Sequence, residues 1–204
     1  RPAHLPASLK QGEDNDTGTT ITSPTDSARE LPREPTTPWI LGLNALLVAA
    51  WLGVLVWQVA VLPEQAPTRF DVGGEPTQWS SRTWTLGYSL LLPLVAALPL
   101  PLLSLLALRR PEMLSVPNRD WWTATGPRIR RFERLLREDL WLITALMMML
   151  FVSIQVVITQ AAAIPGQALP GWLLAVPTVV FLMLLGALMV RMFGGRYAEQ
   201  PDLG

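Results

Sequence analysis

The chain has 204 residues, half of them hydrophobic, and its acidic and basic side chains balance to a formal net charge of zero. It contains no cysteine and a single histidine, His4, which lies in a polar N-terminal stretch. This composition excludes disulfides, cysteine nucleophiles and histidine-ligated haem, zinc or iron, so we expect no cofactor and no metal.

Residues 1–37 form a polar tail that is rich in Pro, Thr, Ser, Asp and Glu and almost free of large apolar residues. Such a segment buries too little apolar surface to offset the entropy that it loses on ordering. We therefore expect this cytoplasmic tail to be disordered by itself, or to be ordered by a partner subunit.

Four long apolar runs follow the tail, at about residues 39–62, 84–108, 140–164 and 172–193. Each matches the roughly 20 apolar residues that, at about 1.5 Å per residue, cross a hydrocarbon core of about 30 Å. The sequence predicts an all-α polytopic membrane protein with a four-helix membrane domain over residues 38–193 and a C-terminal tail over 194–204. None of the runs contains Asp, Glu, Lys or His, which argues against a proton relay, ion-coupled transport and voltage sensing.

The connection over residues 109–139 decides the predicted topology. It carries eight arginines: Arg109, Arg110, Arg119, Arg128, Arg130, Arg131, Arg134 and Arg137. The positive-inside rule makes this connection cytoplasmic, which puts both termini in the cytoplasm and the loop 63–83 outside. The many arginines, with one lysine and abundant Ala, Leu and Pro, are typical of a high-GC bacterial genome. We therefore expect a multi-pass protein of a bacterial plasma membrane.

Tryptophan prefers membrane interfaces, because its ring is apolar while its N–H needs a wet partner. Under this topology we expect four tryptophans at the inner interface, namely Trp39, Trp121, Trp122 and Trp141. The outer interface is expected to hold Trp57, Trp84 and Trp172.

Residues 126–140 carry apolar side chains at helical spacing, at Ile129, Phe132, Leu135 and Leu136. This pattern predicts an amphipathic helix that lies on the inner leaflet and leads into the third span. Its arginines either meet anionic lipid headgroups or only fix the topology from a solvated face. No nucleic-acid partner is expected, because the basic patch is short and tied to the membrane.

The first span contains Ala45, Ala49 and Gly53 at a spacing of four, a ridge on which another helix can approach closely. This ridge packs either within the chain or against another protein. Polar side chains inside the spans are expected to form interhelical hydrogen bonds: Asn44, Gln58, Ser153, Gln155 and Thr159. Prolines in the second and fourth spans kink their helices, for packing or to frame a ligand cavity: Pro93, Pro99, Pro101 and Pro177.

In the outer loop, Gly73-Gly74 predicts a tight turn between Phe70 and Trp79. Asp71 and Glu75 form a carboxylate pair in this turn. General acid–base chemistry or a calcium site would need a nucleophile or a third ligand, and the loop offers neither. We therefore interpret the pair as part of a compact, solvated turn.

The loop carries the pattern Leu62-Pro63, Pro67, Phe70-Asp71, Gly74-Glu75-Pro76, Trp79 and Ser81-Arg82, and a second element reads Val116-Pro117-Asn118-Arg119-Asp120-Trp121-Trp122. Together they resemble an uncharacterised bacterial membrane domain that also forms the N-terminal part of SdpI-type toxin-immunity proteins. In the loop of that domain, a histidine stands where this chain has Arg69, an aspartate near Thr77 and a lysine where it has Arg82. The candidate outer motif is Pro63, Pro67, Arg69, Phe70, Asp71, Gly74, Glu75, Trp79 and Arg82. The candidate inner motif is Pro117, Asn118, Arg119 and Trp122.

The leading hypothesis is a non-catalytic membrane protein that acts through protein–protein interaction, as an accessory or stabilising subunit of a larger membrane complex. Its expected contacts are membrane lipids and partner subunits. The alternative is an SdpI-like immunity or envelope-sensing protein that binds a peptide or envelope ligand through its outer loop. We do not expect an enzyme, because the spans contain no nucleophile–base pair and only Arg69, Asp71 and Glu75 cluster outside them.

Overall fold

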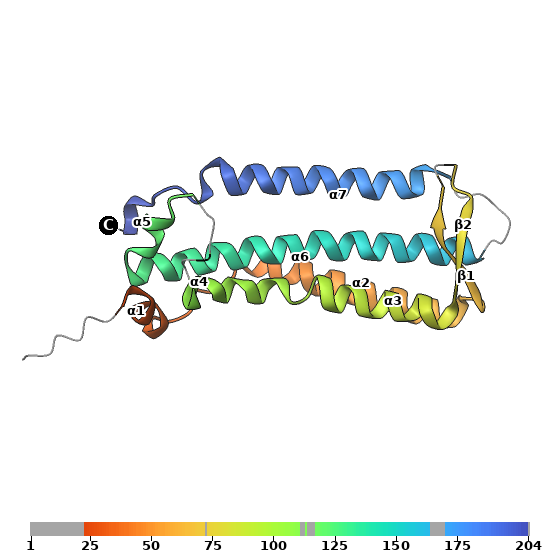
Figure 1. Cartoon of the computed structure of the whole chain (residues 1–204), viewed down its shortest axis with the longest axis horizontal. Coiled ribbons are helices and arrows are strands. Elements are labelled where there is room, and N and C mark those ends of the chain that lie inside the picture. Colours follow the sequence, from red (N-terminus) through yellow and green to blue (C-terminus); the bar gives the residue numbers. More distant parts are fainter. Residues whose placement is uncertain (1–22, 72, 111–112, 114–116, 164–169, 204) are drawn as a thin grey trace, which may run out of the picture.

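The computed structural model of the chain describes residues 23–71, 73–110, 113, 117–163 and 170–203, apart from the Leu174 side chain. Residues 1–22 of the predicted tail and 164–169 of the predicted last loop lie outside this part. Its elements are, in chain order, α1 (Pro24–Glu30), α2 (Pro38–Val61), β1 (Gln65–Phe70), β2 (Pro76–Ser81), α3 (Arg82–Ala96), η1 (Leu100–Leu105), α4 (Leu106–Arg109), α5 (Arg119–Thr123), α6 (Gly126–Ala163), α7 (Trp172–Arg191), η3 (Met192–Arg196) and η4 (Pro201–Leu203) (Figure 1).

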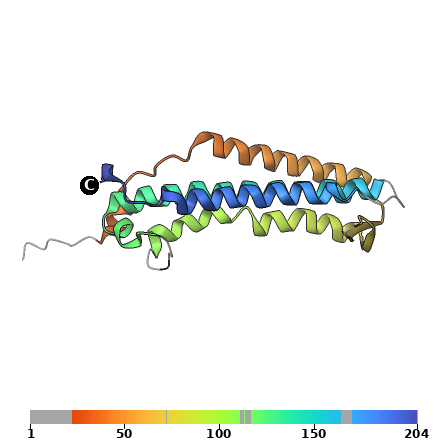
Figure 2. The ribbon, with the colours of Figure 1, turned by 90° about the horizontal axis from the view of Figure 1, so that it is seen from above.

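The long helix α6 is the central element of the fold. In Figure 1, α7 lies on one side of α6 and α2 and α3 lie on the other, while Figure 2 shows α2 and α3 flanking α6 from opposite sides. Within the described residues, four helical stretches are long and apolar enough to cross a membrane: Pro38–Val61, Arg82–Arg109, Gly126–Ala163 and Ala175–Arg196. The prediction of a helical, polytopic membrane protein is confirmed.

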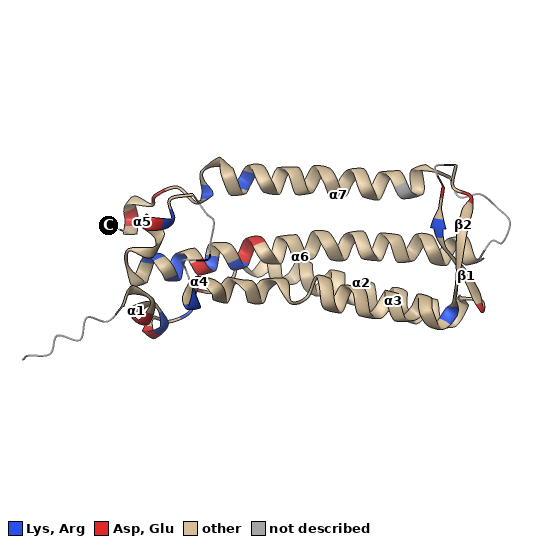
Figure 3. Cartoon of the chain, viewed as in Figure 1, with Lys and Arg blue, Asp and Glu red and all other residues tan. Residues whose placement is uncertain are grey.

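The two ends of this helical assembly differ in charge. α1, α5 and the C-terminal segment lie at one end with the start of α6, whereas β1 and β2 lie at the other (Figure 1). Most acidic and basic residues gather at the first of these ends, which we call the charged end, and few at the hairpin end (Figure 3). The arginine-rich connection and the described parts of both termini therefore lie on the same side of the apolar spans.

Pro93 joins three helices by freeing one carbonyl. Proline lacks the N–H that would bond the carbonyl four residues earlier in a helix, so Ser89 of α3 loses its helical donor. The indole N–H of Trp51 in α2 (2.8 Å) and the side-chain amide of Gln155 in α6 (2.9 Å) donate to that carbonyl instead. We call this arrangement of α2, α3 and α6 the Ser89 junction.

Pro101 acts in the same way further along the second span. It removes the N–H that would bond the Ala97 carbonyl from four residues on. That carbonyl accepts the N–H of Leu100 (3.2 Å) and the hydroxyl of Thr144 in α6 (3.2 Å) instead. The regular helix α3 ends at Ala96 and the span continues as η1 and α4. Near both prolines, a backbone carbonyl of the second span thus accepts a hydrogen bond from a side chain of α6. This is a packing role, one of the two that we predicted for these prolines.

Three of the five polar side chains in the spans form the predicted interhelical bonds. Asn44 donates to the Trp141 carbonyl (3.0 Å), Gln58 to the Gln155 carbonyl (3.3 Å), and Gln155 to Ser89. The other two bond carbonyls of their own helix, four residues earlier, as hydroxyl side chains often do: Ser153 to Met149 and Thr159 to Gln155.

The amphipathic helix predicted over residues 126–140 and the third span form one unbroken helix, α6. Its first turns bury charged side chains instead of presenting them to lipid headgroups: Arg130, Glu133, Arg137, Glu138 and Asp139. Arg137 donates to the carboxylate of Glu133, the hydroxyl of Thr36 and the carbonyl of Glu34. Buried charges need such partners, and the N-terminal tail supplies several of them.

Residues 23–37 of the tail pack on α6, which differs from the expectation that the whole tail lacks structure of its own. α1 approaches so closely that a Cβ atom at Gly126 would lie 3.1 Å from the backbone nitrogen of Ala28. At the end of this segment, Thr37 donates its N–H (3.2 Å) and its hydroxyl (2.6 Å) to Glu138. Charged side chains of α6 therefore bind residues 23–37 within the chain.

Candidate functional site

The predicted outer loop folds as a β-hairpin at the end of the spans. β1 and β2 are antiparallel, with the pairs Gln65–Ser81, Ala66–Ser80, Pro67–Trp79, Arg69–Gln78 and Phe70–Pro76. Thr68 is the extra residue between two of these pairs, a β-bulge, and its hydroxyl bonds that of Ser80 (3.0 Å). Pro67 and Pro76 made these strands hard to predict from the sequence, because proline is tolerated only where a strand has a free edge. Both strands of a two-stranded hairpin have one.

Asp71 holds the turn that joins the two strands. Its Oδ1 atom accepts the N–H of Glu75 (2.9 Å), and its own N–H donates to the Glu75 carbonyl (3.0 Å). Gly74 has a φ of 84°, in the left-handed region that favours glycine. The prediction of a compact turn is confirmed. Nowhere in the described residues do three or more His, Cys, Asp or Glu side chains form a group that could hold a metal ion.

The base of the hairpin is fixed to the membrane helices. The Arg82 guanidinium donates to the Val59 carbonyl in the last turn of α2, where helix carbonyls lack partners. The Ser81 hydroxyl accepts a backbone N–H of α3 and caps that helix (3.3 Å). Pro67 is fully buried, and Phe70 packs on α6. These members of the outer motif therefore hold the hairpin in place.

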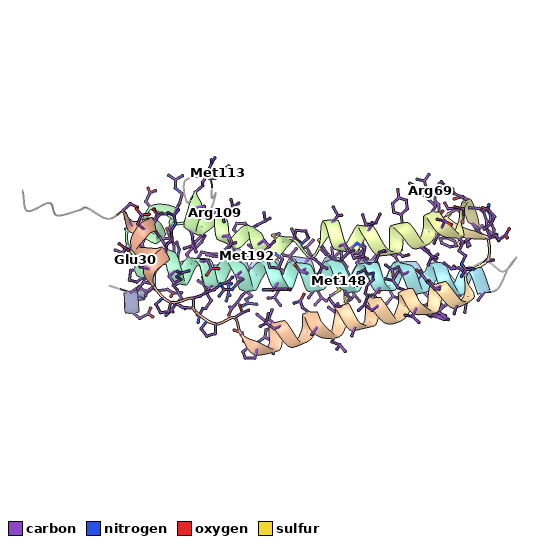
Figure 4. All side chains as sticks on the ribbon, turned by 90° about the horizontal axis from the view of Figure 1, so that it is seen from below. Glu30, Arg69, Arg109, Met113, Met148 and Met192 are labelled. Atoms are coloured by element: carbon purple, nitrogen blue, oxygen red, sulfur yellow. The ribbon has the colours of Figure 1, made fainter. Side chains whose placement is uncertain are left out.

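The remaining members of the outer motif face outward. Pro63 and Arg69 are exposed, and 49% of the Trp79 side chain is exposed. Among the described residues, none forms an ion pair or hydrogen bond with the Arg69 guanidinium. Figure 4 shows Arg69 at the hairpin end of the molecule. Within the described part of the chain, a positive charge thus lies beside the spans without a partner.

A groove lies under the hairpin between α3 and α6, with a volume of about 340 Å³. Its polar lining includes Thr68, Arg69, Gln78, Ser80 and Gln155, and Arg69 is the only charged residue among its described lining residues. Gln155 is buried, and its Oε1 atom has no hydrogen-bond partner in the described part of the chain. The groove therefore offers one cation, several hydrogen-bonding groups and an apolar floor.

A second groove of about 260 Å³ continues along α3 and has an entirely apolar lining. The two grooves share Trp84, Tyr88 and Leu92. The rings of Trp84 and Tyr88 meet edge to face, with centroids 5.2 Å apart. We call the two together the amphipathic groove, because it is charged under the hairpin and apolar along the span.

The inner motif holds the C-terminal segment. Trp122 is buried against Phe132, and its indole N–H donates to the Tyr197 carbonyl (3.0 Å). Asn118, with a φ of 55° that asparagine tolerates, donates to the same carbonyl (3.4 Å). The N–H of Trp122, predicted to find a wet partner at the inner interface, thus has its partner inside the protein. Three members of the motif are exposed: Pro117, Asn118 and Arg119.

An ion-pair network at the charged end is the main feature that the sequence analysis missed. Arg196 donates to Glu138 (2.8 Å) and to Asp139 (3.1 Å), and the Tyr197 hydroxyl donates to Asp139 (2.8 Å). Burial, and then the neighbouring Asp139, raise the pKa of the Tyr197 phenol above its ordinary value. The partners come from distant parts of the chain, so no local spacing announces them.

The small-residue ridge lies on the exposed side of α2. Ala45, Ala49 and Gly53 are all exposed, and a Cβ atom at Gly53 would meet nothing within 4 Å. The buried residues of α2 lie on its opposite face: Ile40, Asn44, Trp51 and Gln58. No described part of the chain packs on the ridge.

A family model described as a domain of unknown function (DUF1648) matches residues 45–97. The match begins in α2, covers the hairpin and ends just after α3, so it includes the whole outer motif and not the inner one. It supports the prediction of an uncharacterised domain in this stretch. Comparisons with curated proteins and with solved structures gave no significant match.

Proposed function

We propose that this protein is a non-catalytic membrane protein that serves as an accessory or stabilising subunit, through contact between α2 and a membrane helix of a partner protein. The outward face of α2 is the observation that carries this proposal. It consists mostly of small residues, all exposed: Gly42, Ala45, Ala49, Gly53 and Ala60. Lipid tails provide no hydrophobic drive for helix association, so helices meet where small side chains let their backbones approach.

The position of α7 gives this proposal further support. Only Leu188 of its described side chains is buried, and a row of half-buried residues four apart follows the face toward α6: Leu173, Pro177, Phe181 and Leu185. Gly186, like Gly42 and Gly53, could carry a Cβ atom with nothing within 4 Å. Helices that contact α6 along one row leave their other faces open to partner helices.

Leucine at Ala49 or Ala50 gives a matched test, because both alanines are exposed but point about 100° apart around the helix. Tagged wild type and both variants are extracted in mild detergent, and co-purifying proteins are quantified by mass spectrometry. We expect a stoichiometric membrane partner with the wild type and with Ala50→Leu, and at least a fivefold loss with Ala49→Leu. A monomeric wild-type protein, or equal recovery with both variants, contradicts the proposal.

We also propose that the protein resides in a bacterial plasma membrane with its charged end in the cytoplasm, because arginines near span ends are retained on that side. The chain has no cysteine, so single cysteines can report exposure without background. A membrane-impermeant maleimide is expected to label Thr77→Cys in intact cells and Ala198→Cys only after lysis. Both positions are exposed, and the reverse pattern contradicts this orientation.

A second candidate function is immunity or envelope sensing through the hairpin. It is favoured by the half-exposed Trp79 on a hairpin that is braced by the helices beneath it. The resemblance to SdpI-type immunity proteins motivates the same test. A strain without the protein is expected to become sensitive to secreted antimicrobial peptides, and Trp79→Ala is expected to reproduce that sensitivity. Unchanged sensitivity in the deletion strain rejects this candidate.

A further inference from the structure

We propose that the amphipathic groove binds a phospholipid with an anionic headgroup, taken from the leaflet at the hairpin end. Its phosphate would pair with Arg69, and one acyl chain would follow α3. This site lies beside α3 and α6, away from the outward face of α2, and it would stand whether or not that face binds a partner.

The charge of the groove selects the headgroup. Arg69 is the only charged residue among those described in its lining, and no described carboxylate neutralises that guanidinium. A guanidinium presents a planar fork of donors that matches a phosphate. The amide of Gln78 and the hydroxyls of Thr68 and Ser80 line the same part of the groove and supply further hydrogen bonds. An anionic, oxygen-rich headgroup is complementary to this arrangement.

The dimensions of the apolar part match one leaflet. Its lining runs from Trp84 to Val95, about 16 Å at 1.5 Å per residue. Half of a hydrocarbon core of about 30 Å is about 15 Å. Trp84 and Tyr88, which are both more than half exposed, stand where aromatic residues mark the membrane interface. A phosphate at Arg69 therefore lies at headgroup depth, and an acyl chain beside Leu91 and Val95 lies in the membrane interior.

Two substitutions separate the polar from the apolar part of this site. Arg69→Gln removes the charge, whereas Arg69→Lys keeps it. Gly87 lines the apolar part, and a Cβ atom there would meet nothing within 4 Å, so Gly87→Leu fills the groove without a clash. Arg110→Gln is the matched control, because Arg110 is an exposed arginine at the opposite end of the same span.

The full chain is reconstituted in phosphatidylcholine vesicles with increasing fractions of dibrominated phosphatidylglycerol or dibrominated phosphatidylcholine. The signal of Trp84 is the difference in quenching between the wild type and Trp84→Phe. We expect half-maximal quenching of Trp84 at a mole fraction of brominated phosphatidylglycerol about fivefold lower than that of brominated phosphatidylcholine. This ratio corresponds to the attraction of about 1 kcal/mol between one interfacial arginine and an anionic lipid. Arg69→Lys and Arg110→Gln should keep this preference.

Arg69→Gln should abolish the preference, and Gly87→Leu should abolish it with Arg69 still in place. Equal quenching of the wild type by both lipids overturns the proposal, because ordinary contact with surrounding lipid does not distinguish the headgroups. A preference that survives either substitution overturns it as well. If Arg69→Gln unfolds the hairpin, Gly87→Leu alone decides the outcome.

Discussion

The Ser89 junction makes a prediction that can be tested by a double-mutant cycle. Trp51→Phe and Gln155→Leu each remove one of the two donors to the Ser89 carbonyl. A single interhelical hydrogen bond in a membrane contributes about 0.6 kcal/mol on average and up to about 1.7. Each single variant keeps one donor. The free energy of unfolding that it loses at the junction should therefore stay within that range. The double variant leaves a buried carbonyl unpaired, which costs about 1–3 kcal/mol more.

We therefore expect a coupling energy of at least about 1 kcal/mol between the two substitutions. Pro93→Ala supplies the internal control, because the restored N–H can bond the Ser89 carbonyl within α3. In that background the coupling should fall to within about 0.5 kcal/mol of zero, the limit of additivity. The assay is unfolding by sodium dodecyl sulfate in mixed micelles, followed by far-ultraviolet circular dichroism because Trp51→Phe alters the fluorescence. Additive losses in the Pro93 background, or equal coupling in both backgrounds, would show that the two donors do not share the Ser89 carbonyl as described.

Three further predictions concern other parts of the molecule. Gly126→Ala should displace α1, because its new Cβ atom would lie 3.1 Å from the Ala28 nitrogen. The rate of proteolysis within residues 24–30 should then rise several-fold. Gly42→Ala adds a Cβ atom that meets nothing within 4 Å, so it should leave this rate unchanged. Asp71→Asn keeps the Oδ1 acceptor of the turn, so hydrogen exchange of the Glu75 amide should stay slow. Asp71→Ala removes this acceptor and should destabilise the turn by about 1 kcal/mol. Equal exchange rates in both variants would contradict the role of Oδ1 as the acceptor. The raised pKa of Tyr197 favours its neutral form in the folded protein, so this stabilisation is complete below the ordinary pKa of about 10 and declines as the pH rises above it. Tyr197→Phe should remove that alkaline decline, and identical pH profiles would contradict it.

The spans could be predicted because length and apolarity alone decide whether a helix can cross a bilayer. The interhelical bonds of Asn44, Gln58 and Gln155 followed from the cost of an unpaired amide in lipid. Ser153 and Thr159 were predicted less well, because a hydroxyl can satisfy itself on its own helix. These outcomes depend on local chemistry that a sequence displays.

The hairpin and the ion-pair network depend on contacts that a sequence does not display. Pro67 and Pro76 argue against strands until the hairpin is known to have two free edges. The arginines of residues 126–140 have the spacing of a membrane-surface helix, yet many of their partners lie in the tail and the C-terminal segment. That Arg69 has no partner among the described residues is likewise visible only once the groove beneath the hairpin is built. Both candidate interaction surfaces are defined by which faces of α2 and α3 remain uncovered.

The most direct test of the proposed function is site-specific photocrosslinking in native membranes. A photoreactive amino acid is introduced at Ala49 or at Ala50, two exposed neighbours of which only Ala49 lies on the small-residue face. We expect a discrete crosslink to one membrane protein from Ala49 and none from Ala50. Crosslinks to lipid alone from both positions would contradict the claim that α2 binds a partner helix.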